Sequence, residues 1–271
     1  MRRRSECAYR LVMDLGLAGK TAVVTGASKG IGLAVVRGLA AGGARVIAGA
    51  RTSSAGLDEL ARAGQVQTVL ADLAAPSGPA LLIEAAGERI DILVNNVGGA
   101  PARTGGFLSI TDEDWHATIE LNLMAAVRTT RAALPKMIAA GTGAIVSTCS
   151  VNAYLPDPGV MDYSAAKAAL ASFSKALSKE VGPKGIRVNT VSPGPVATDL
   201  WLGKGGVAAT VGAASGADPG DVQRQAASQM VTGRFTRPEE VADLVLFLAS
   251  ERAGNVTGSD FAIDGGLVQT L

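Results

Sequence analysis

The chain has 271 residues, a mass of 27.3 kDa and 25 Lys and Arg residues against 24 Asp and Glu residues. This length fits one large α/β domain or two small ones, and 48% hydrophobic with 18% charged residues excludes global disorder. The net charge of +1 argues against a nucleic-acid-binding protein with a broad basic face. No run of about 18 uncharged apolar residues is present, so a membrane-spanning helix is not expected.

Cysteine and histidine are scarce. Cys7 and Cys149 cannot build a disulfide framework, and no Cys/His cluster has zinc-site spacing, so no metal is expected. A reducing cytoplasm is the default location for such a chain. The single histidine, His116, lies beside Trp115 in a helical pattern and is interpreted as structural or surface-exposed. It gives little support to Ser-His-Asp chemistry.

The first residues are basic, as in a secretion signal, but Asp14 interrupts the apolar run that should follow. Residues 1–12 are therefore predicted to be a disordered leader, with Met13 as an alternative start. No linker or composition break divides residues 13–271, which are read as a single domain.

Short β-branched runs alternate with Ala/Leu-rich helical stretches along this domain. The predicted strands are 21–25, 45–50, 67–70, 90–94, 144–148, 186–191 and 261–263. Helices are predicted over 31–41 and from 163 through 177. Uniformly apolar strands separated by helices predict a parallel sheet covered on both faces, which binds ligands at the carboxyl ends of its strands. The Gly/Ala-rich stretch around 199–235 is the least regular and is a candidate substrate lid.

The first strand runs into a glycine-rich turn with Gly26, Gly30 and Gly32, followed at once by a helix. Glycines let the backbone approach a pyrophosphate, and the helix N-terminus offers free N–H groups. A plain tight turn is the alternative. The spacing G-x-x-x-G-x-G is neither the commoner G-x-G-x-x-G nor a P-loop.

The second strand ends in Ala50-Arg51-Thr52, without the carboxylate that would accept the 2′-hydroxyl of NAD(H). Lys29 in the glycine-rich turn could reach the same place. Two cations and no anion favour NADP(H), although each cation alone could be a solvated surface charge.

Ser150, Tyr163 and Lys167 form the most specific pattern. The i,i+4 spacing puts Tyr163 and Lys167 on one helix face, and Ser150 follows the fifth predicted strand. A free phenol titrates near pH ~10, and a neighbouring ammonium lowers that pKa.

These motifs together resemble the short-chain dehydrogenase/reductase family across nearly all of residues 17–271. The matching elements are Thr25-Gly26-x-x-x-Gly30-Ile31-Gly32, Asn95-Asn96-Val97-Gly98, Asn122, Ser150, Tyr163-x-x-x-Lys167 and Pro193-Gly194-Pro195-Val196-x-Thr198. The resemblance implies a Rossmann-like, doubly wound sheet of about seven parallel strands and NAD(P)-dependent reduction of a ketone or oxidation of a secondary alcohol.

The resemblance also implies roles for single residues. Tyr163 is the general acid or base, Lys167 holds the nicotinamide ribose and lowers the Tyr163 pKa, and Ser150 binds the substrate oxygen. Asn122 fixes a helix bend and a water of the proton relay. The cofactor-binding residues expected from the turn pattern and the resemblance are Gly26, Ser28, Lys29, Gly30, Ile31, Gly32, Arg51, Asp72, Leu73, Asn95, Gly98, Tyr163, Lys167, Pro193, Gly194, Val196 and Thr198.

Two departures from the family pattern stand out: Val97 replaces the usual alanine, and Cys149, interpreted as a small buried hydrophobe, precedes Ser150. The substrate class stays open. Relatives that reduce 3-oxoacyl-carrier protein use basic docking residues; Lys184 matches one such position, but residues 138–143 offer no cation at another.

Two further alternatives remain, a non-redox lyase or dehydratase and a non-catalytic nucleotide sensor. The family resemblance implies a homotetramer, with a dimer as the alternative. The Ala, Gly and Arg bias suggests a bacterial source.

Overall fold

The computed structural model describes residues 14–270. The predicted leader, Met13 and Cys7 lie outside the described residues.

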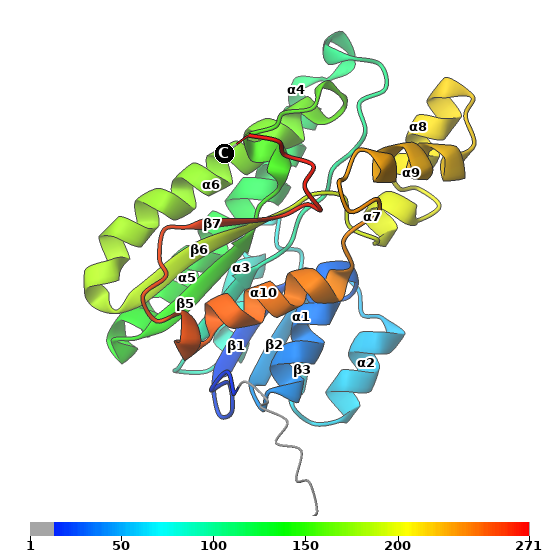
Figure 1. Ribbon diagram of the computed structural model, residues 1–271. Coiled ribbons are helices and arrows are strands. Elements are labelled where there is room, and N and C mark those ends of the chain that lie inside the picture. Colours follow the sequence, from blue (N-terminus) through cyan, green and yellow to red (C-terminus); the bar gives the residue numbers. More distant parts are fainter. Residues whose placement is uncertain (1–13, 271) are drawn as a thin grey trace, which may run out of the picture.

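The chain folds around a seven-stranded sheet in the order β3-β2-β1-β4-β5-β6-β7, with every neighbouring pair parallel (Figure 1). The strands are β1 (Thr21–Thr25), β2 (Arg45–Ala50), β3 (Val66–Leu70), β4 (Ile92–Asn95), β5 (Gly143–Thr148), β6 (Ile186–Pro193) and β7 (Asp260–Ile263). The predicted doubly wound, Rossmann-like fold is confirmed. The strand order reverses between β1 and β4, which is where such sheets form their ligand crevice.

Helices cover both faces of this sheet. The α-helices of the described residues are α1 (Gly30–Ala41), α2 (Ala55–Arg62), α3 (Gly78–Ala85), α4 (Asp112–Ile119), α5 (Ala125–Ala140), α6 (Met161–Val181), α7 (Asp199–Leu202), α8 (Val207–Ser215), α9 (Pro219–Ser228) and α10 (Pro238–Ala249). Side chains of α1 and α10 pack on one face, and side chains of α3, α5 and α6 pack on the other.

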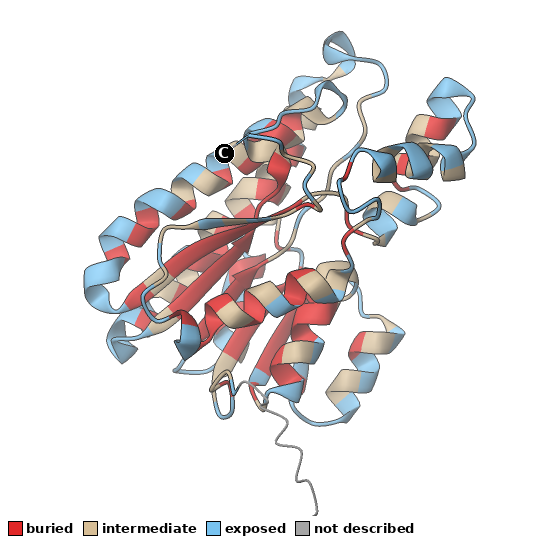
Figure 2. Ribbon diagram, in the orientation of Figure 1, coloured by how far each residue is buried: buried red, intermediate tan, exposed pale blue. Residues whose placement is uncertain are grey.

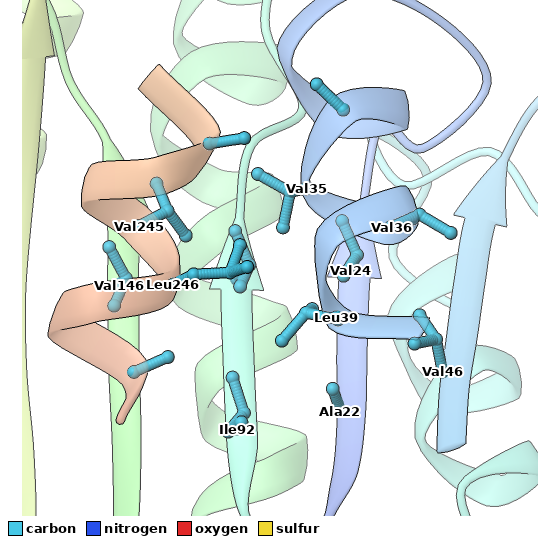
Figure 3. Packing of buried hydrophobic residues seen from close by; sticks show 14 of the residues in the cluster. Ala22, Val24, Val35, Val36, Leu39, Val46, Ile92, Val146, Val245 and Leu246 are labelled. Atoms are coloured by element: carbon cyan, nitrogen blue, oxygen red, sulfur yellow. The ribbon is translucent and has the colours of Figure 1, made fainter. Parts of the chain in front are cut away.

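The core explains why the strands are apolar throughout. Figure 2 shows the central strands as buried, and Figure 3 shows Leu39 of α1, Val245 of α10 and Val24 of β1 within one cluster of buried side chains. All three are fully buried, and burying each such side chain contributes about 1.5–3 kcal/mol. A strand covered on both faces has no solvent side, so it carries no polar alternation.

The structure corrects two local expectations. The fourth strand begins at Ile92 rather than at residue 90, because the Asp91 carboxylate accepts the Thr21 N–H at 2.8 Å and pairs with Arg89 at the amino end of the strand. The segment expected to be least regular instead forms α7, α8 and α9. Its alanines favour helix, and turns near Gly206 and Gly216 separate the three helices.

Among residues 14–270, no helix is long and apolar enough to cross a membrane.

Candidate active site

A cavity of about 440 Å³ opens at the carboxyl ends of β4, β5 and β6. It collects predicted site residues from distant parts of the chain. Those that line it are Ile31, Gly98, Ser150, Tyr163, Lys167, Pro193, Gly194, Val196 and Thr198.

The glycine-rich turn beside the cavity needs its glycines for conformation and for space. Gly26 and Gly30 have φ values of 65° and 54°, which side chains rarely adopt. A Cβ on Gly32 would lie 2.1 Å from the Gly26 carbonyl oxygen. Helix α1 then starts without a side-chain cap, so its first N–H groups have no such partner.

The predicted 2′-phosphate side lies where two loops meet. The Ser54 hydroxyl donates to the Ser28 carbonyl at 2.6 Å, which ties the loop after β2 to the glycine-rich turn. Lys29 and Arg51 are both exposed on these loops, and Ala50 is buried. The Lys29 ammonium lies 3.9 Å from the carboxylate of Asp199, the first residue of α7.

Three of the predicted cofactor-binding residues, Asp72, Leu73 and Asn95, have different positions. Asp72 is exposed after β3, where its carboxylate accepts the Ala74 N–H at 3.1 Å, and Leu73 is buried. The Asn95 side chain donates to the Thr130 hydroxyl at 3.0 Å between the sheet and α5, and it does not line the cavity. Asn95 is therefore brought to the correct strand end but points away from the cleft.

Tyr163 and Lys167 occupy the first two turns of α6. The Lys167 ammonium is buried, donates to the Thr148 carbonyl at 2.8 Å and lies 5.7 Å from the centre of the Tyr163 ring. Burial lowers the pKa of Lys167. Burial also raises the pKa of Tyr163 to about 12, although the Ser150 hydroxyl acts in the opposite direction. The predicted lowering of the Tyr163 pKa is therefore not found in this structure, because desolvation outweighs the hydrogen bond.

Ser150 lies directly after β5 at the bottom of the cleft. Its hydroxyl donates to the Asn152 side-chain oxygen at 3.1 Å and accepts the Asn152 N–H at 3.2 Å. This arrangement fixes the rotamer of Ser150 in a short 3-10 turn over Val151–Ala153. A rigid hydroxyl next to a phenol can bind a single carbonyl oxygen from two directions.

Asn122 is buried within a π-helical turn, Glu120–Met124, that joins α4 to α5. Such turns often occur at functional sites. The Asn122 side chain donates to the Gly99 carbonyl at 2.9 Å and accepts the Gly99 N–H at 3.1 Å. The helix irregularity that the resemblance implies is present here, and the water of the proton relay stays a prediction.

The remaining singled-out residues are peripheral to this chemistry. Cys149 is buried, and desolvation raises its pKa to about 11, which agrees with its interpretation as a small hydrophobe. His116 is exposed on α4 and does not line the cavity. Val97 is accommodated beside the glycine-rich turn. Within residues 14–270, no three His, Cys, Asp or Glu side chains gather in a metal-binding arrangement.

The predicted lid contributes an apolar wall. Trp201 and Val207 line the cavity. The ring centroids of Trp201 and Phe235 lie 5.3 Å apart in an edge-to-face arrangement. Met230 of the same segment is buried and does not line the cavity.

Sequence reasoning assigned no individual role to several residues that hold the site together. Asn96 donates its side-chain amide to the carbonyls of Thr25 and Gly26, each at 3.2 Å, and so fixes the turn that Gly26 opens. Asn152 and Thr148 fix Ser150 and Lys167. Asn96 had a visible signal, because it stands next to Asn95 at a strand end. Thr148 acts through its backbone carbonyl, for which its residue type gives no signal.

Known proteins share this arrangement along almost the whole chain. A family model described as "Enoyl-(Acyl carrier protein) reductase" matches residues 26–268. The crystal structure of L-sorbose reductase from Gluconobacter frateurii, complexed with NADPH and L-sorbose, superposes with a TM-score of 0.87 and 38% identity, over 96% of this chain and 100% of that one.

Curated relatives agree. Oxidoreductase YvrD of Bacillus subtilis is 35% identical over 96% of this chain and 100% of its own. The 3-oxoacyl-[acyl-carrier-protein] reductase FabG of Thermotoga maritima is 35% identical over 93% of this chain and 99% of its own. With the seven-stranded sheet, the glycine-rich turn and the Ser150, Tyr163 and Lys167 cluster, these matches show that the chain belongs to the short-chain dehydrogenase/reductase family of oxidoreductases.

Proposed function

We propose that the protein is an NADP(H)-dependent oxidoreductase that reduces an uncharged ketone to a secondary alcohol or catalyses the reverse reaction. The observation that carries the proposal is that Ser150, Tyr163 and Lys167 line one cleft beside the glycine-rich turn. The NADPH complex of the similar L-sorbose reductase supports the choice of cofactor.

The residues present fit a phosphorylated dinucleotide. Gly26, Gly30 and Gly32 leave room for a pyrophosphate at the uncapped start of α1. Lys29 and Arg51 offer positive charge for the 2′-phosphate, and Ala50 offers no carboxylate that would repel it. When bound, the reduced cofactor supplies the hydride.

The chain's own residues would handle the proton and the oxygen. Tyr163 donates its hydroxyl proton to the carbonyl oxygen, on which negative charge develops. Ser150 donates a hydrogen bond to the same oxygen, and Lys167 orients the nicotinamide ribose. The raised pKa of Tyr163 keeps the phenol protonated at neutral pH, which is the form that reduction needs.

The lining of the cleft disfavours a substrate with negative charge, and it contains the carboxylate of Asp157. Apolar side chains form most of its outer wall, among them Leu155, Val160 and Trp201. Lys167 is its only lysine or arginine among the described residues, and the proposed role of Lys167 directs it to the ribose. A substrate carboxylate or phosphate would therefore lack a partner. The amides of Asn152 and Gln229 can bind substrate hydroxyls, which is compatible with an uncharged ketose.

Reduction of a 3-oxoacyl-carrier protein is the second candidate, supported by the similarity to the Thermotoga maritima FabG. Lys184 is exposed, but it lies between α6 and the start of β6. It is therefore at the amino ends of the strands, whereas this chain's own cleft is at their carboxyl ends. A carrier docked on Lys184 would thus have to reach the cleft of another subunit.

The test is a panel of uncharged ketones, ketoses, keto acids and 3-oxoacyl thioesters, followed by NADPH absorbance with NADH in parallel. Ketone-dependent NADPH oxidation supports the proposal. NADPH binding without oxidation by any carbonyl would indicate the nucleotide-sensing alternative, and substrate turnover without net NADPH consumption would indicate the lyase or dehydratase.

We also propose a homotetramer, with a dimer as the alternative. The small residues Ala165, Ala168 and Ala169 on α6 permit close approach of a second helix, which supports this assembly. Light scattering of the purified protein distinguishes the two states.

A further inference from the structure

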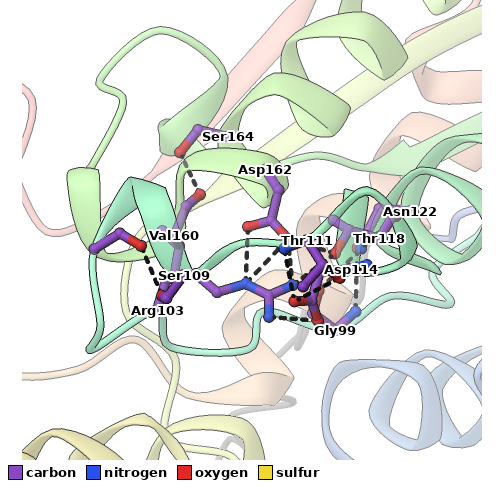
Figure 4. A network of polar contacts seen from close by, with 11 residues as sticks. Gly99, Arg103, Ser109, Thr111, Asp114, Thr118, Asn122, Val160, Asp162 and Ser164 are labelled. Atoms are coloured by element: carbon purple, nitrogen blue, oxygen red, sulfur yellow. Dashed lines mark hydrogen bonds and ion pairs between the residues drawn. The ribbon is translucent and has the colours of Figure 1, made fainter. Parts of the chain in front are cut away.

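Arg103 lies in the segment that connects β4 to α4, outside every motif that carries the family resemblance. Its side chain is only 14% exposed, and its guanidinium contacts three residues of two helices (Figure 4). One terminal nitrogen lies 2.9 Å from the Asp114 carboxylate of α4. The other lies 2.5 Å from the Asp162 carboxylate of α6 and 3.4 Å from the Thr118 hydroxyl.

Asp162 is the residue immediately before Tyr163. Its side chain is fully buried and also accepts the Thr118 hydroxyl at 2.6 Å. Helix α6 begins without a side-chain cap on Val160. An uncapped first turn tends to open, so the turn that carries Tyr163 depends on the anchoring of Asp162.

The backbone around Arg103 is fixed to the cleft as well. The Arg103 N–H donates to the Gly159 carbonyl at 2.7 Å, in the segment that leads from Ser150 to α6. Four residues earlier, Gly99 exchanges two hydrogen bonds with Asn122. The short stretch 99–103, whose first residues line the cavity, is therefore held at both ends.

We infer that Arg103 is a positioning residue, which acts through Asp162 to hold Tyr163 in place relative to Ser150 and the cleft wall. Arg103 does not line the cavity, so it reaches the substrate only through other groups. The inference rests on the proposed function, because it assigns Tyr163 the proton transfer.

The energetics of buried ion pairs agree with a positioning role. Such a pair contributes little net stability compared with apolar packing of the same volume, but loss of one partner leaves an unpaired buried charge. Without Arg103, the Asp162 carboxylate gains by moving toward water, and Tyr163 moves with it. A displacement of about 1 Å in an active site can cost a hundredfold in rate.

The test compares R103M, R103K, D162N and the double variant R103M/D162N with wild type. R187M is the matched control. Arg187 is also partly buried, and it donates to the Leu248, Ser250 and Val256 carbonyls. It lies at the amino end of β6, away from the cleft. We expect R103M and D162N to lower kcat about 10- to 100-fold, with NADPH affinity changed less than about threefold. The double variant should be no slower than the slower single variant, because both remove one interaction. R103K should recover part of the rate, and R187M should lose stability but keep its kcat.

A second measurement does not depend on activity. Amide hydrogen exchange over residues 164–168, whose N–H groups close the first turns of α6, should be faster in R103M and D162N than in wild type, but not in R187M. If R103M does not fold, R103K and D162N carry the same comparison.

The two proposals fail differently. A wild-type protein that reduces no ketone overturns the proposed function, and the exchange experiment still tests Arg103. If the wild type is active, three results would each overturn the inference. They are R103M and D162N rates within twofold of wild type, losses that multiply in the double variant, and unchanged exchange over residues 164–168.

Discussion

Cofactor preference offers a quantitative test of the loops after β1 and β2. The wild-type protein should bind NADPH more tightly than NADH, because Lys29 and Arg51 are proposed to border the 2′-phosphate. A charge-assisted hydrogen bond contributes about 1.5–3 kcal/mol in a shielded setting, but both side chains are exposed, so water and salt reduce this to roughly 1 kcal/mol each. Lys29 must also leave Asp199, at a cost of roughly 0–1 kcal/mol.

These contributions leave about 1–2 kcal/mol, which corresponds to a roughly 5- to 30-fold lower Kd for NADPH. The double variant A50D/R51S should reverse the preference, because the introduced carboxylate would accept the ribose hydroxyl of NADH and repel the phosphate. R62S removes an exposed charge on α2 and serves as the control, which should keep the wild-type ratio. The assay is fluorescence titration of both cofactors at fixed ionic strength. Equal wild-type Kd values for NADPH and NADH would refute the assignment of Lys29 and Arg51.

Three more outcomes test the site and the fold. Tyr163→Phe should reduce turnover by about 10²–10⁴-fold and leave the NADPH Kd almost unchanged; retention of more than a tenth of the rate, measured by NADPH absorbance, would contradict the proton-donor role. Lys167→Ala should weaken NADPH binding and turnover together, because the Lys167 ammonium is proposed to hold the nicotinamide ribose, whereas unchanged NADPH affinity and turnover would argue against that role. Hydrogen bonds from Arg103 and Thr118 outweigh burial and lower the pKa of Asp162, and ion pairing with Arg234 lowers that of Glu240 to about 2. A carboxylate whose pKa is lowered by folding stabilises the fold above pH ~4, and this contribution is lost as the pH falls through the pKa of the folded state. The melting temperature of the wild type should therefore fall between pH ~4 and ~2, and that of D162N should fall less.

The sheet was predictable because its signal is local. Strands such as β1 and β5 are buried on both faces and therefore stand out as short apolar runs between helices. Their exact ends depend on neighbours elsewhere in the chain. The Asp91 side chain, just before β4, accepts the backbone N–H of Thr21, which lies 70 residues earlier. The helices of the lid were missed because glycine-rich composition hides short helices that tertiary contacts stabilise.

The site was predictable where a residue type carries its own chemistry. Ser150, Tyr163 and Lys167 have such chemistry, and the structure brings them to one cleft. Asn95 was placed at the correct strand end, but its side chain follows the pleat away from the cleft. Backbone acceptors such as the Thr148 carbonyl leave no trace in the sequence.

Polar contacts between residues far apart in the sequence could not be predicted from local patterns. One of them, between Arg103 and Asp162, connects the fold to the proposed reaction. Burial raises the pKa of Tyr163 and keeps it protonated at neutral pH, which suits a proton donor. A partly buried phenol can donate its proton only where its hydroxyl is aimed at the substrate oxygen, so the proposed reaction also requires a rigid first turn of α6. Val160 provides no side-chain cap for that turn, and Arg103, 59 residues before Asp162, provides the anchor instead. Protonation and orientation of Tyr163 therefore have separate causes, and variants of Arg103 should change the second while leaving the first intact.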